Sequence, residues 1–574
     1  MAAKRLLFGK RALSGGEATV LAALLVLAAT LFVLPLFRLF VVGVAPEGTL
    51  ALGPLQAAIE SRATARALWN SVESSTLSAL AATLIGATLA LIVALTNVRA
   101  KGILIFLILL PMMIPPHVTA IAWIQALGPS SPLLRTLGVA PELGTTHPLY
   151  SREGVILLLS LQHAPLVFLI VRAALRAQPA ELMDAARTSG ASGAMALRRV
   201  VLPLLLPALF AGFALAFVSA LGNFGIPALL GIPARYTTLP VLIWQRMASF
   251  GVGMLTNVAV LAMIMAALAV VAVVILAFLQ RQVGAKLAGP PRPPLTINLG
   301  RRRPLVEGAL WAFIALVLVL PLASLLSTAL VKTYGLPLRA DTITLENFAE
   351  ILFRQSVTVR AFVNSTLAAG LAAVVLAAIA IIIGHLREAR GRGQRAVGGG
   401  LSLLGDVTYA VPGIVLSVAF ILVFIRPLPL LGVSLYNTLL IIALAYVTAF
   451  LSIAQKPVAA AFAQLDPLLD DAARVSGAGY TRRMTRIFAP LVAPAAASGA
   501  ILVFLTAYNE ITVSALLWSA GNETIGTTIF NYEDGGYTTL AAAMSAVTVF
   551  ATIALMLALD RAGRHLPPGA VPWR

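Results

Sequence analysis

A seven-residue string of charged, small and polar residues occurs twice in this chain of 574 residues. The copies are DAARTSG at Asp184–Gly190 and DAARVSG at Asp471–Gly477, and they lie 287 residues apart, half the chain length. Each opens on a carboxylate, which complements the dipole of a helix N-terminus, and closes on a glycine, which accepts a left-handed turn. The paired alanines between them let another surface approach closely. These residue types and spacings predict two equivalent docking elements.

A proline follows each string at the same distance. Pro203 and Pro490 suit the first turn of a following membrane helix, where a missing N–H is harmless. Segments 181–203 and 468–490 are therefore each expected to form a helix–turn–helix parallel to the membrane surface. The predicted docking residues are Asp184, Ala185, Ala186, Gly190, Leu202 and Pro203 in the first segment and Asp471, Ala472, Ala473, Gly477 and Pro490 in the second.

The residues that enzymes use for chemistry are scarce in this chain. A phosphate-binding Gly-x4-Gly-Lys-(Ser/Thr) loop does not occur, since the only Gly-Lys is Gly9-Lys10, which Arg11 follows. The chain has no Cys, and its five His are scattered without the spacing of metal ligands. We therefore expect no catalytic residue, no bound metal and no cofactor of its own.

Composition indicates that membrane helices position the docking elements. The chain is 60% hydrophobic and 11% charged, with a mean hydropathy of +0.95, whereas soluble proteins are about 25% charged. A net charge of +19 would suggest a nucleic-acid partner in a soluble protein. Here Lys and Arg form short clusters between apolar runs, which is typical of cytoplasmic loops, so no nucleic-acid partner is expected.

The apolar runs predict an all-α polytopic membrane protein with about twelve transmembrane helices. They are continuous rather than alternating, and each is close to the roughly 20 residues that a spanning helix needs. With twelve spans every basic cluster falls on one side, which places both termini and both strings in the cytoplasm. The runs lie near 18–42, 72–97, 102–126, 154–176, 200–222, 256–280, 305–331, 361–385, 401–425, 436–455, 488–508 and 538–560.

The two halves also match outside the repeated strings. An even number of spans in each half leaves both facing the same way. We therefore predict two parallel six-helix repeats, 1–281 and 305–574, joined by a Gly- and Pro-rich cytoplasmic linker at 282–304. The matching features are Asn70-Ser71 with Asn364-Ser365, Pro115-Pro116 with Pro412-Gly413, and Asn223 with Asn509.

The string with its flanks resembles the EAA motif of the permease subunits of bacterial ABC importers. The pattern is (Glu/Asp)-Ala-Ala-x3-Gly-x9-(Ile/Val)-x-Leu-Pro; both copies have Asp where Glu is usual, and the second has Ala489 where Leu is preferred. In that family the motif forms a coupling helix that inserts into a cleft of a cytoplasmic ATPase. The resemblance implies a type I importer permease fold, fused from two repeats, in the bacterial inner membrane.

The same resemblance implies the partners. Two copies of a separate ABC ATPase, which use ATP with Mg, would bind the two coupling motifs. A periplasmic solute-binding protein would land on the external loops near 128–153 and 332–360. The inferred mechanism is alternating access, in which ATPase closure pushes the coupling helices and the two halves rock about a shared path.

The cargo is indicated less strongly. The fused branch includes ferric-iron, thiamine, 2-aminoethylphosphonate and polyamine permeases. The segments NFGIPALL at Asn223–Leu230 and NEITVSALL at Asn509–Leu517 look most like the ferric-iron members. Ferric iron is therefore the predicted cargo, and the other three remain open.

Five residues are predicted to line the translocation path. Intramembrane polar and ionisable groups usually serve function, and prolines kink helices and free carbonyl groups that can line a cavity. For Glu510 the alternative is a solvated loop carboxylate. The path candidates are Asn223, Asn509, Glu510, Pro115 and Pro412.

Two other classes of protein fit the sequence less well. An ion-coupled secondary transporter would also have twelve spans and an internal repeat, but it would need ionisable residues in mid-span, and almost none are present. A membrane enzyme or assembly scaffold would need a cluster of His, Asp and Glu on one face of the bilayer. Neither class explains the paired coupling motifs.

Overall fold

The computed structural model describes residues 15–563, apart from 47, 179–184, 186–187, 191, 250–252, 284–296, 390, 429–431 and 467, together with 567, 570 and 571. Every regular element in these ranges is a helix, which satisfies the backbone internally as a lipid environment requires. The helices of the first half are α2 (Gly15–Ala28), η1 (Ala29–Val33), α3 (Leu34–Val44), α4 (Gly53–Glu60), α5 (Arg62–Leu95), α6 (Lys101–Met113), α7 (Pro116–Leu127), α8 (Pro132–Thr136), α9 (Arg152–Ala177), α11 (Gly193–Ala196), η2 (Leu197–Val201), α12 (Leu202–Leu221), η3 (Pro227–Gly231), α13 (Leu239–Met247) and α14 (Met254–Val283).

The second half repeats this order of elements. Its helices are η4 (Gly300–Arg302), α15 (Arg303–Ile314), η5 (Ala315–Val319), α16 (Leu320–Ala329), α17 (Glu346–Ala349), η6 (Glu350–Arg354), α18 (Ser356–Glu388), α19 (Arg392–Ala410), α20 (Gly413–Phe424), α21 (Leu439–Phe462), α22 (Leu468–Val475), α23 (Tyr480–Arg483), η7 (Met484–Phe488), α24 (Ala489–Tyr508), α25 (Ser514–Leu517), α26 (Ile525–Asp534) and α27 (Thr538–Ala562).

Two of the twelve expected spans are broken. The described residues contain ten continuous helices long and apolar enough to cross a membrane, and two further pairs of helices that are sharply bent. The expected span near 102–126 is α6 followed by α7 at 101°, and that near 401–425 is α19 followed by α20 at 109°. Pro115-Pro116 and Pro412 stand at these breaks, because proline lacks the N–H that would continue the helix and disfavours helical geometry before it.

The prolines after the docking strings lie inside helices rather than in a first turn, which corrects the sequence prediction. Continuous helical segments run over Leu197–Leu221 and Tyr480–Tyr508 and contain Pro203 and Pro490. In each, a π-helical turn (η2 or η7) ends two residues before the proline. The wider turn accommodates the hydrogen bond that proline cannot make. Turns η1 and η5 precede Pro35 and Pro321 in the same way.

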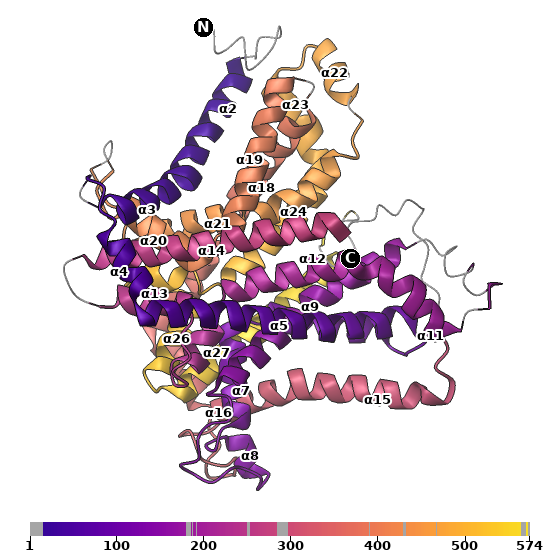
Figure 1. Ribbon diagram of the computed structural model, residues 1–574, viewed down its shortest axis with the longest axis vertical. Coiled ribbons are helices and arrows are strands. Elements are labelled where there is room, and N and C mark those ends of the chain that lie inside the picture. Colours follow the sequence, from indigo (N-terminus) through magenta and orange to yellow (C-terminus); the bar gives the residue numbers. More distant parts are fainter. Residues whose placement is uncertain are drawn as a thin grey trace.

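The core of each half is a three-helix bundle, and the first spans are exchanged between halves. In the first bundle α5, α9 and α12 pack together, and α18, α21 and α24 pack equivalently in the second. The first-half helix α3 packs against α20 of the second half, while α16 of the second half packs against α7 of the first. Figure 1 shows the resulting splayed molecule, with α22 and α23 at one end and α11 at another.

Glycines allow the bundle helices to pack closely at matching positions. A Cβ atom added to Gly212 would lie 3.0 Å from Val167 Cγ1, and one added to Gly499 would lie 2.8 Å from the Ala454 carbonyl oxygen. Gly499 lies 287 residues after Gly212, and Ala454 lies 287 residues after Val167. The helix crossings are therefore built alike in the two repeats.

The tightest of these crossings gives a stability prediction. In Gly86→Ala the new Cβ would lie 2.4 Å from the Ala164 carbonyl oxygen, so α5 and α9 must move apart. We expect the free energy of unfolding to fall by about 1–3 kcal/mol, with a lower midpoint of thermal unfolding in detergent. Gly370→Ala in α18 meets no heavy atom within 4 Å and is the control. Equal losses in the two variants would contradict the packing described.

Candidate functional site

The second docking element is a short helix closed by a glycine turn. Helix α22 has Asp470 and Asp471 in its first turn, where a carboxylate complements the helix dipole. Gly477 has a φ of 75°. Its N–H donates to the Arg474 carbonyl oxygen (2.9 Å), and the N–H of Ala478 donates to that of Ala473 (3.0 Å). These two bonds form a Schellman C-cap, which requires the left-handed residue that glycine supplies.

Within α22 the paired alanines differ in environment. Ala472 is exposed, whereas Ala473 is buried. Val475 is 90% exposed at the end of the helix. One exposed face of α22 is therefore available for contact with another protein, and the opposite face packs on the chain itself.

The first docking element is described only in part. Gly190 has a φ of 80°, and it is exposed together with Ala185, Thr188 and Ser189. The N–H of Ser189 donates to the Ala185 carbonyl oxygen (3.0 Å), as in a helical turn. The predicted docking residues Asp184 and Ala186 lie outside the described residues. Both strings thus end on a glycine with positive φ, as their sequence predicts.

The expected helix–turn–helix is not a separate surface unit. After the turn at Gly477, helix α23 continues through η7 into α24, so the second helix of the motif is the start of a spanning helix. In the first half α11 continues through η2 into α12. Leu202 and Pro203 therefore lie within the spanning helix that follows the docking turn, and Pro490 does the same in the second half. Each docking turn is thus joined directly to the end of a spanning helix.

An ion cluster that the sequence analysis missed holds the second docking element. Arg483, whose side chain is 3% exposed, pairs with Asp470 of α22 and with Glu17 of α2 (2.5 Å to the latter). Arg474 pairs with the same two carboxylates, at 2.8 Å from Asp470 and 3.4 Å from Glu17. Burial raises the pKa of Asp470, but the Arg483 and Arg474 guanidinium groups together lower it by more than burial raises it. The pKa of Asp470 therefore lies below its ordinary value.

A cavity of about 480 Å³ lies between the two repeats. Its first-repeat walls are the α6–α7 break, α9 and the end of α12, and its second-repeat walls come from α19, α21, α24 and the segment after α24. Of the five predicted path residues, Pro115, Asn223, Asn509 and Glu510 line this cavity. Pro412 is not among the lining residues. It lies next to the lining residue Gly222, where an added Cβ atom would be 3.7 Å from Pro412 Cα.

The broken helix α6–α7 is held open by an amide from α9. Gln162 Nε2 donates to the carbonyl oxygens of Pro111 (3.3 Å) and Ile114 (3.2 Å) at the end of α6, and the Pro111 oxygen also accepts from the Ile114 N–H (3.3 Å). The side-chain oxygen of Gln162 (Oε1) is buried without a hydrogen-bonding partner among the described residues, and the side-chain oxygen of Asn509 (Oδ1) is too. Two residues that line the cavity thus each have a buried side-chain amide oxygen with no such partner.

Asn223 and Glu510 perform the same local task in the two repeats. Asn223 Oδ1 accepts from the N–H of Ile226 (3.1 Å), and Glu510 Oε1 accepts from the N–H of Val513 (2.7 Å). Glu510 lies 287 residues after Asn223, and Val513 lies 287 residues after Ile226. The structure therefore matches Asn223 with Glu510, whereas the sequence comparison paired it with Asn509. Since a neutral amide performs this task in the first repeat, the cap does not require the Glu510 charge. Glu510 is also no freely solvated loop carboxylate, because both its oxygens accept backbone N–H groups.

An apolar constriction lies where the cavity meets a second pocket. Phe224, Ile511 and Phe530 are buried in one cluster, and the Phe224 and Phe530 ring centroids are 5.6 Å apart. Beyond it lies an outer pocket of about 330 Å³, walled in part by Trp244 and Trp518. Ile511 lines both the cavity and this pocket, so it stands at the boundary between them.

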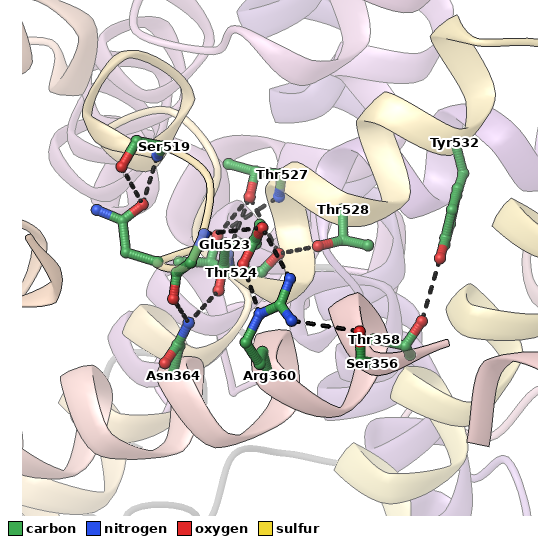
Figure 2. Close-up of polar contacts among 12 residues, drawn as sticks. Ser356, Thr358, Arg360, Asn364, Ser519, Glu523, Thr524, Thr527, Thr528 and Tyr532 are labelled. Atoms are coloured by element: carbon green, nitrogen blue, oxygen red, sulfur yellow. Dashed lines mark hydrogen bonds and ion pairs between the residues drawn. The ribbon is translucent and has the colours of Figure 1, made fainter. Parts of the chain in front are cut away.

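The loop beyond the constriction is fixed by the Asn-Ser pair of the second repeat, as Figure 2 shows for Asn364. Asn364 Nδ2 donates to the Glu523 carbonyl oxygen (3.0 Å), and Ser365 Oγ accepts from the N–H of Ile525 (2.9 Å), the first residue of α26. Arg360, one turn earlier on α18, pairs with the Glu523 carboxylate at 3.3 Å. Two successive turns of α18 thus hold the segment that precedes α26.

The first repeat uses its own Asn-Ser pair identically. Asn70 Nδ2 donates to the Thr237 carbonyl oxygen (2.9 Å), and Ser71 Oγ accepts from the N–H of Leu239 (2.7 Å), the first residue of α13. These pairs lie about two turns inside α5 and α18, because both helices begin earlier than the apolar runs expected near 72–97 and 361–385.

Comparison with known proteins places both halves in one family. The family described as binding-protein-dependent transport system inner membrane component matches residues 82–287 and 379–571. A probable ABC transporter permease protein of Sinorhizobium fredii is 28% identical over 532 residues, 89% of each chain. A ferric transport system permease protein of Actinobacillus pleuropneumoniae is 23% identical over 79% of this chain and 64% of its own. A probable molybdenum ABC transporter permease protein of Haloferax volcanii is 32% identical over 32% of this chain and 64% of its own.

Proposed function

Because this chain belongs to the binding-protein-dependent transport system inner membrane component family, we propose that it passes ferric iron from a periplasmic binding protein to the cytoplasm. The chain is the permease subunit of an ABC importer, and ATP hydrolysis falls to a separate subunit. The observation that carries the proposal of ATP-driven transport is the pair of exposed, left-handed glycine turns at Gly190 and Gly477.

The transport mechanism proposed is alternating access. One ATPase copy binds at each docking element, and the helices that follow, α11–α12 and α23–α24, receive the push. Figure 1 shows α11 and α22 in separate parts of the molecule. Their approach would narrow the cavity on the docking side and separate Phe224, Ile511 and Phe530, which opens the path to the outer pocket.

The charge of the cavity favours a cationic cargo. Glu510 contributes a carboxylate to the lining, and the same cavity is lined by Gln162 and Asn509, whose buried side-chain amide oxygens have no partner among the described residues. Among the described lining residues there is no Lys or Arg that would attract an anion. Hard cations such as ferric iron are bound by oxygen atoms, whereas an oxyanion would be repelled by the carboxylate. The similarity to a ferric transport permease agrees with this preference.

The orientation proposed puts both docking elements and both termini in the cytoplasm. The binding protein then lands on the opposite face, on the loops near 128–153 and 332–360. Such a chain is a multi-pass protein of a bacterial inner membrane.

Uptake by cells tests the cargo. We expect deletion of the chain to abolish uptake of radiolabelled ferric iron delivered by its binding protein, and expression of the chain to restore it. Uptake of molybdate, sulfate, thiamine, 2-aminoethylphosphonate and a polyamine is measured in the same cells. Intact iron uptake with loss of one of these others would retire the iron proposal and leave the permease assignment in place.

A further inference from the structure

We infer that the two docking elements are unequal, because Glu17 on the first helix of the first repeat positions the docking helix of the second repeat. Glu17 is thus a positioning residue for coupling, and α2 forms part of the second docking site. This inference rests on the proposed function, in which each element binds one ATPase copy.

The contacts that hold the second element cross between the repeats. Glu17 belongs to α2, and its side chain is 6% exposed. It pairs with Arg483 on α23 and with Arg474 on α22, the helices that flank the Gly477 turn. Asp470 accepts from the same two arginines. Two carboxylates and two guanidinium groups therefore lock the angle between α22, the turn and α2, and Figure 1 shows α2 beside this end of the molecule.

The first element lacks the residues for the same lock. Residues 287 positions before Asp470 and Arg483 are Met183 and Ala196, and neither is ionisable. The residue 287 positions after Glu17 is Pro304, near the start of the second repeat's first span, and Arg301, Arg302 and Arg303 precede it. The two halves therefore differ in sequence at the positions that form the ion cluster.

The acidic residue that the second repeat does have on this helix binds elsewhere. Glu307 of α15 accepts from Arg303 Nε and from the backbone N–H of Arg99, each at 2.8 Å. Arg99 lies in the loop between α5 and α6, not in a docking element. Glu307 is thus a matched control: a carboxylate with an arginine partner, near the start of the exchanged helix of the other repeat.

Unequal positioning has a consequence for ATPase binding. A docking helix that is already fixed loses less conformational freedom when it binds. The second element should therefore engage the ATPase faster and more tightly than the first. Movement of α22 should also reach α2 directly, and through α3 it should reach α20, against which α3 packs.

Single cysteines test this difference because the chain has none of its own. Thr188 and Val475 are matched positions, 287 residues apart and exposed in both docking elements. Thr188→Cys or Val475→Cys is placed in the full chain, purified with the ATPase that co-purifies with it, and treated with a cysteine-to-lysine cross-linker. The rate of cross-linking to the ATPase is measured for each, alone and combined with Glu17→Gln, Glu17→Asp or Glu307→Gln.

We expect the Val475→Cys rate to exceed the Thr188→Cys rate by roughly fivefold or more, the lower end of typical coupling between sites. Glu17→Gln should bring the Val475→Cys rate down to the Thr188→Cys rate without changing the latter. Glu17→Asp, which keeps the charge, should restore much of the difference, and Glu307→Gln should leave both rates unchanged.

Three results would have distinct meanings. Equal rates at the two cysteines with Glu17 intact would overturn the inference. An equal slowing of both by Glu17→Gln would overturn it as well, since it would indicate a general effect on folding. Cross-linking at neither position, in any background, would instead contradict the proposed docking of an ATPase.

Discussion

Replacement of both Gly190 and Gly477 by valine is expected to abolish co-purification of the ATPase with the chain. Both glycines have φ values near 80°, a conformation that costs a residue with a side chain about 1–3 kcal/mol. The cost is at the upper end for a β-branched residue. Because each turn directs a docking helix, relief of the strain would rotate that helix. Together the two changes should weaken ATPase binding on the order of a hundredfold or more, measured as retention of the ATPase on the immobilised chain.

Neighbouring glycines provide the controls for this experiment. Gly193 and Gly479 lie within a few residues of the two turns, have no positive φ, and would meet no heavy atom within 4 Å on gaining a Cβ. The Gly193→Val and Gly479→Val double variant should retain the ATPase. Normal retention by the Gly190→Val and Gly477→Val variant, or equal loss in both double variants, would show that the turns themselves do not position the docking helices.

The second large effect is expected from Glu510→Gln. The glutamine oxygen can still accept from the Val513 N–H, as Asn223 accepts from Ile226 in the first repeat. The variant therefore removes the charge of the cavity and keeps the bond from Val513, while the bond from the Ser514 N–H to the second oxygen is lost. Two opposite unit charges about 4 Å apart attract by about 4 kcal/mol at an effective dielectric constant of about 20, so the initial rate of ferric iron import into proteoliposomes should fall by roughly tenfold or more when the charge is lost.

A matched change separates the charge from the cap. Asn223→Gln alters the corresponding cap of the first repeat without altering any charge, and it should reduce iron import much less than Glu510→Gln does. ATP hydrolysis by the assembled complex should continue in both variants, since neither residue touches a docking element. Iron import at the normal rate in Glu510→Gln would contradict the role given to this carboxylate and would reopen the choice of cargo.

The sequence predicted the spans well because their signal is local. Continuous apolar runs locate each of the twelve helical segments to within about ten residues, and the pairing of a carboxylate with a glycine identified α22 and its turn. The prolines predicted the breaks at Pro115 and Pro412 but not their angles. A break of about 100° depends on what packs beside it, and here Gln162 on α9 satisfies the exposed carbonyl groups. No spacing in the chain links Gln162 to Pro111.

The π-helical turns before Pro203 and Pro490 were not predicted from the sequence. A proline is compatible both with the first turn of a helix and with a position just after a π-helical turn. The types of the residues that precede it only weakly indicate which of these two positions it occupies. The recurrence of the same device before Pro35 and Pro321 is the signal that could have distinguished the two.

The candidate site was predicted in its parts but not in its assembly. The sequence identified Asn223, Asn509 and Glu510 as polar groups near the ends of spans, and the structure places all three on one cavity. It did not identify Ile511, Phe224 and Phe530, since buried apolar residues look alike in any membrane segment. The Glu17 cluster was missed because Glu17 lies 457 residues before Arg474 and 466 before Arg483, and because the exchange of the first spans brings them together.

The central claim, that both repeated strings dock an ATPase in the cytoplasm, is tested most directly by labelling Thr188→Cys and Val475→Cys with a membrane-impermeant maleimide. We predict that both cysteines react in inside-out vesicles stripped of the ATPase, that neither reacts in right-side-out vesicles, and that added ATPase protects both. Reaction from opposite faces of the membrane, or from neither face, would contradict the claim.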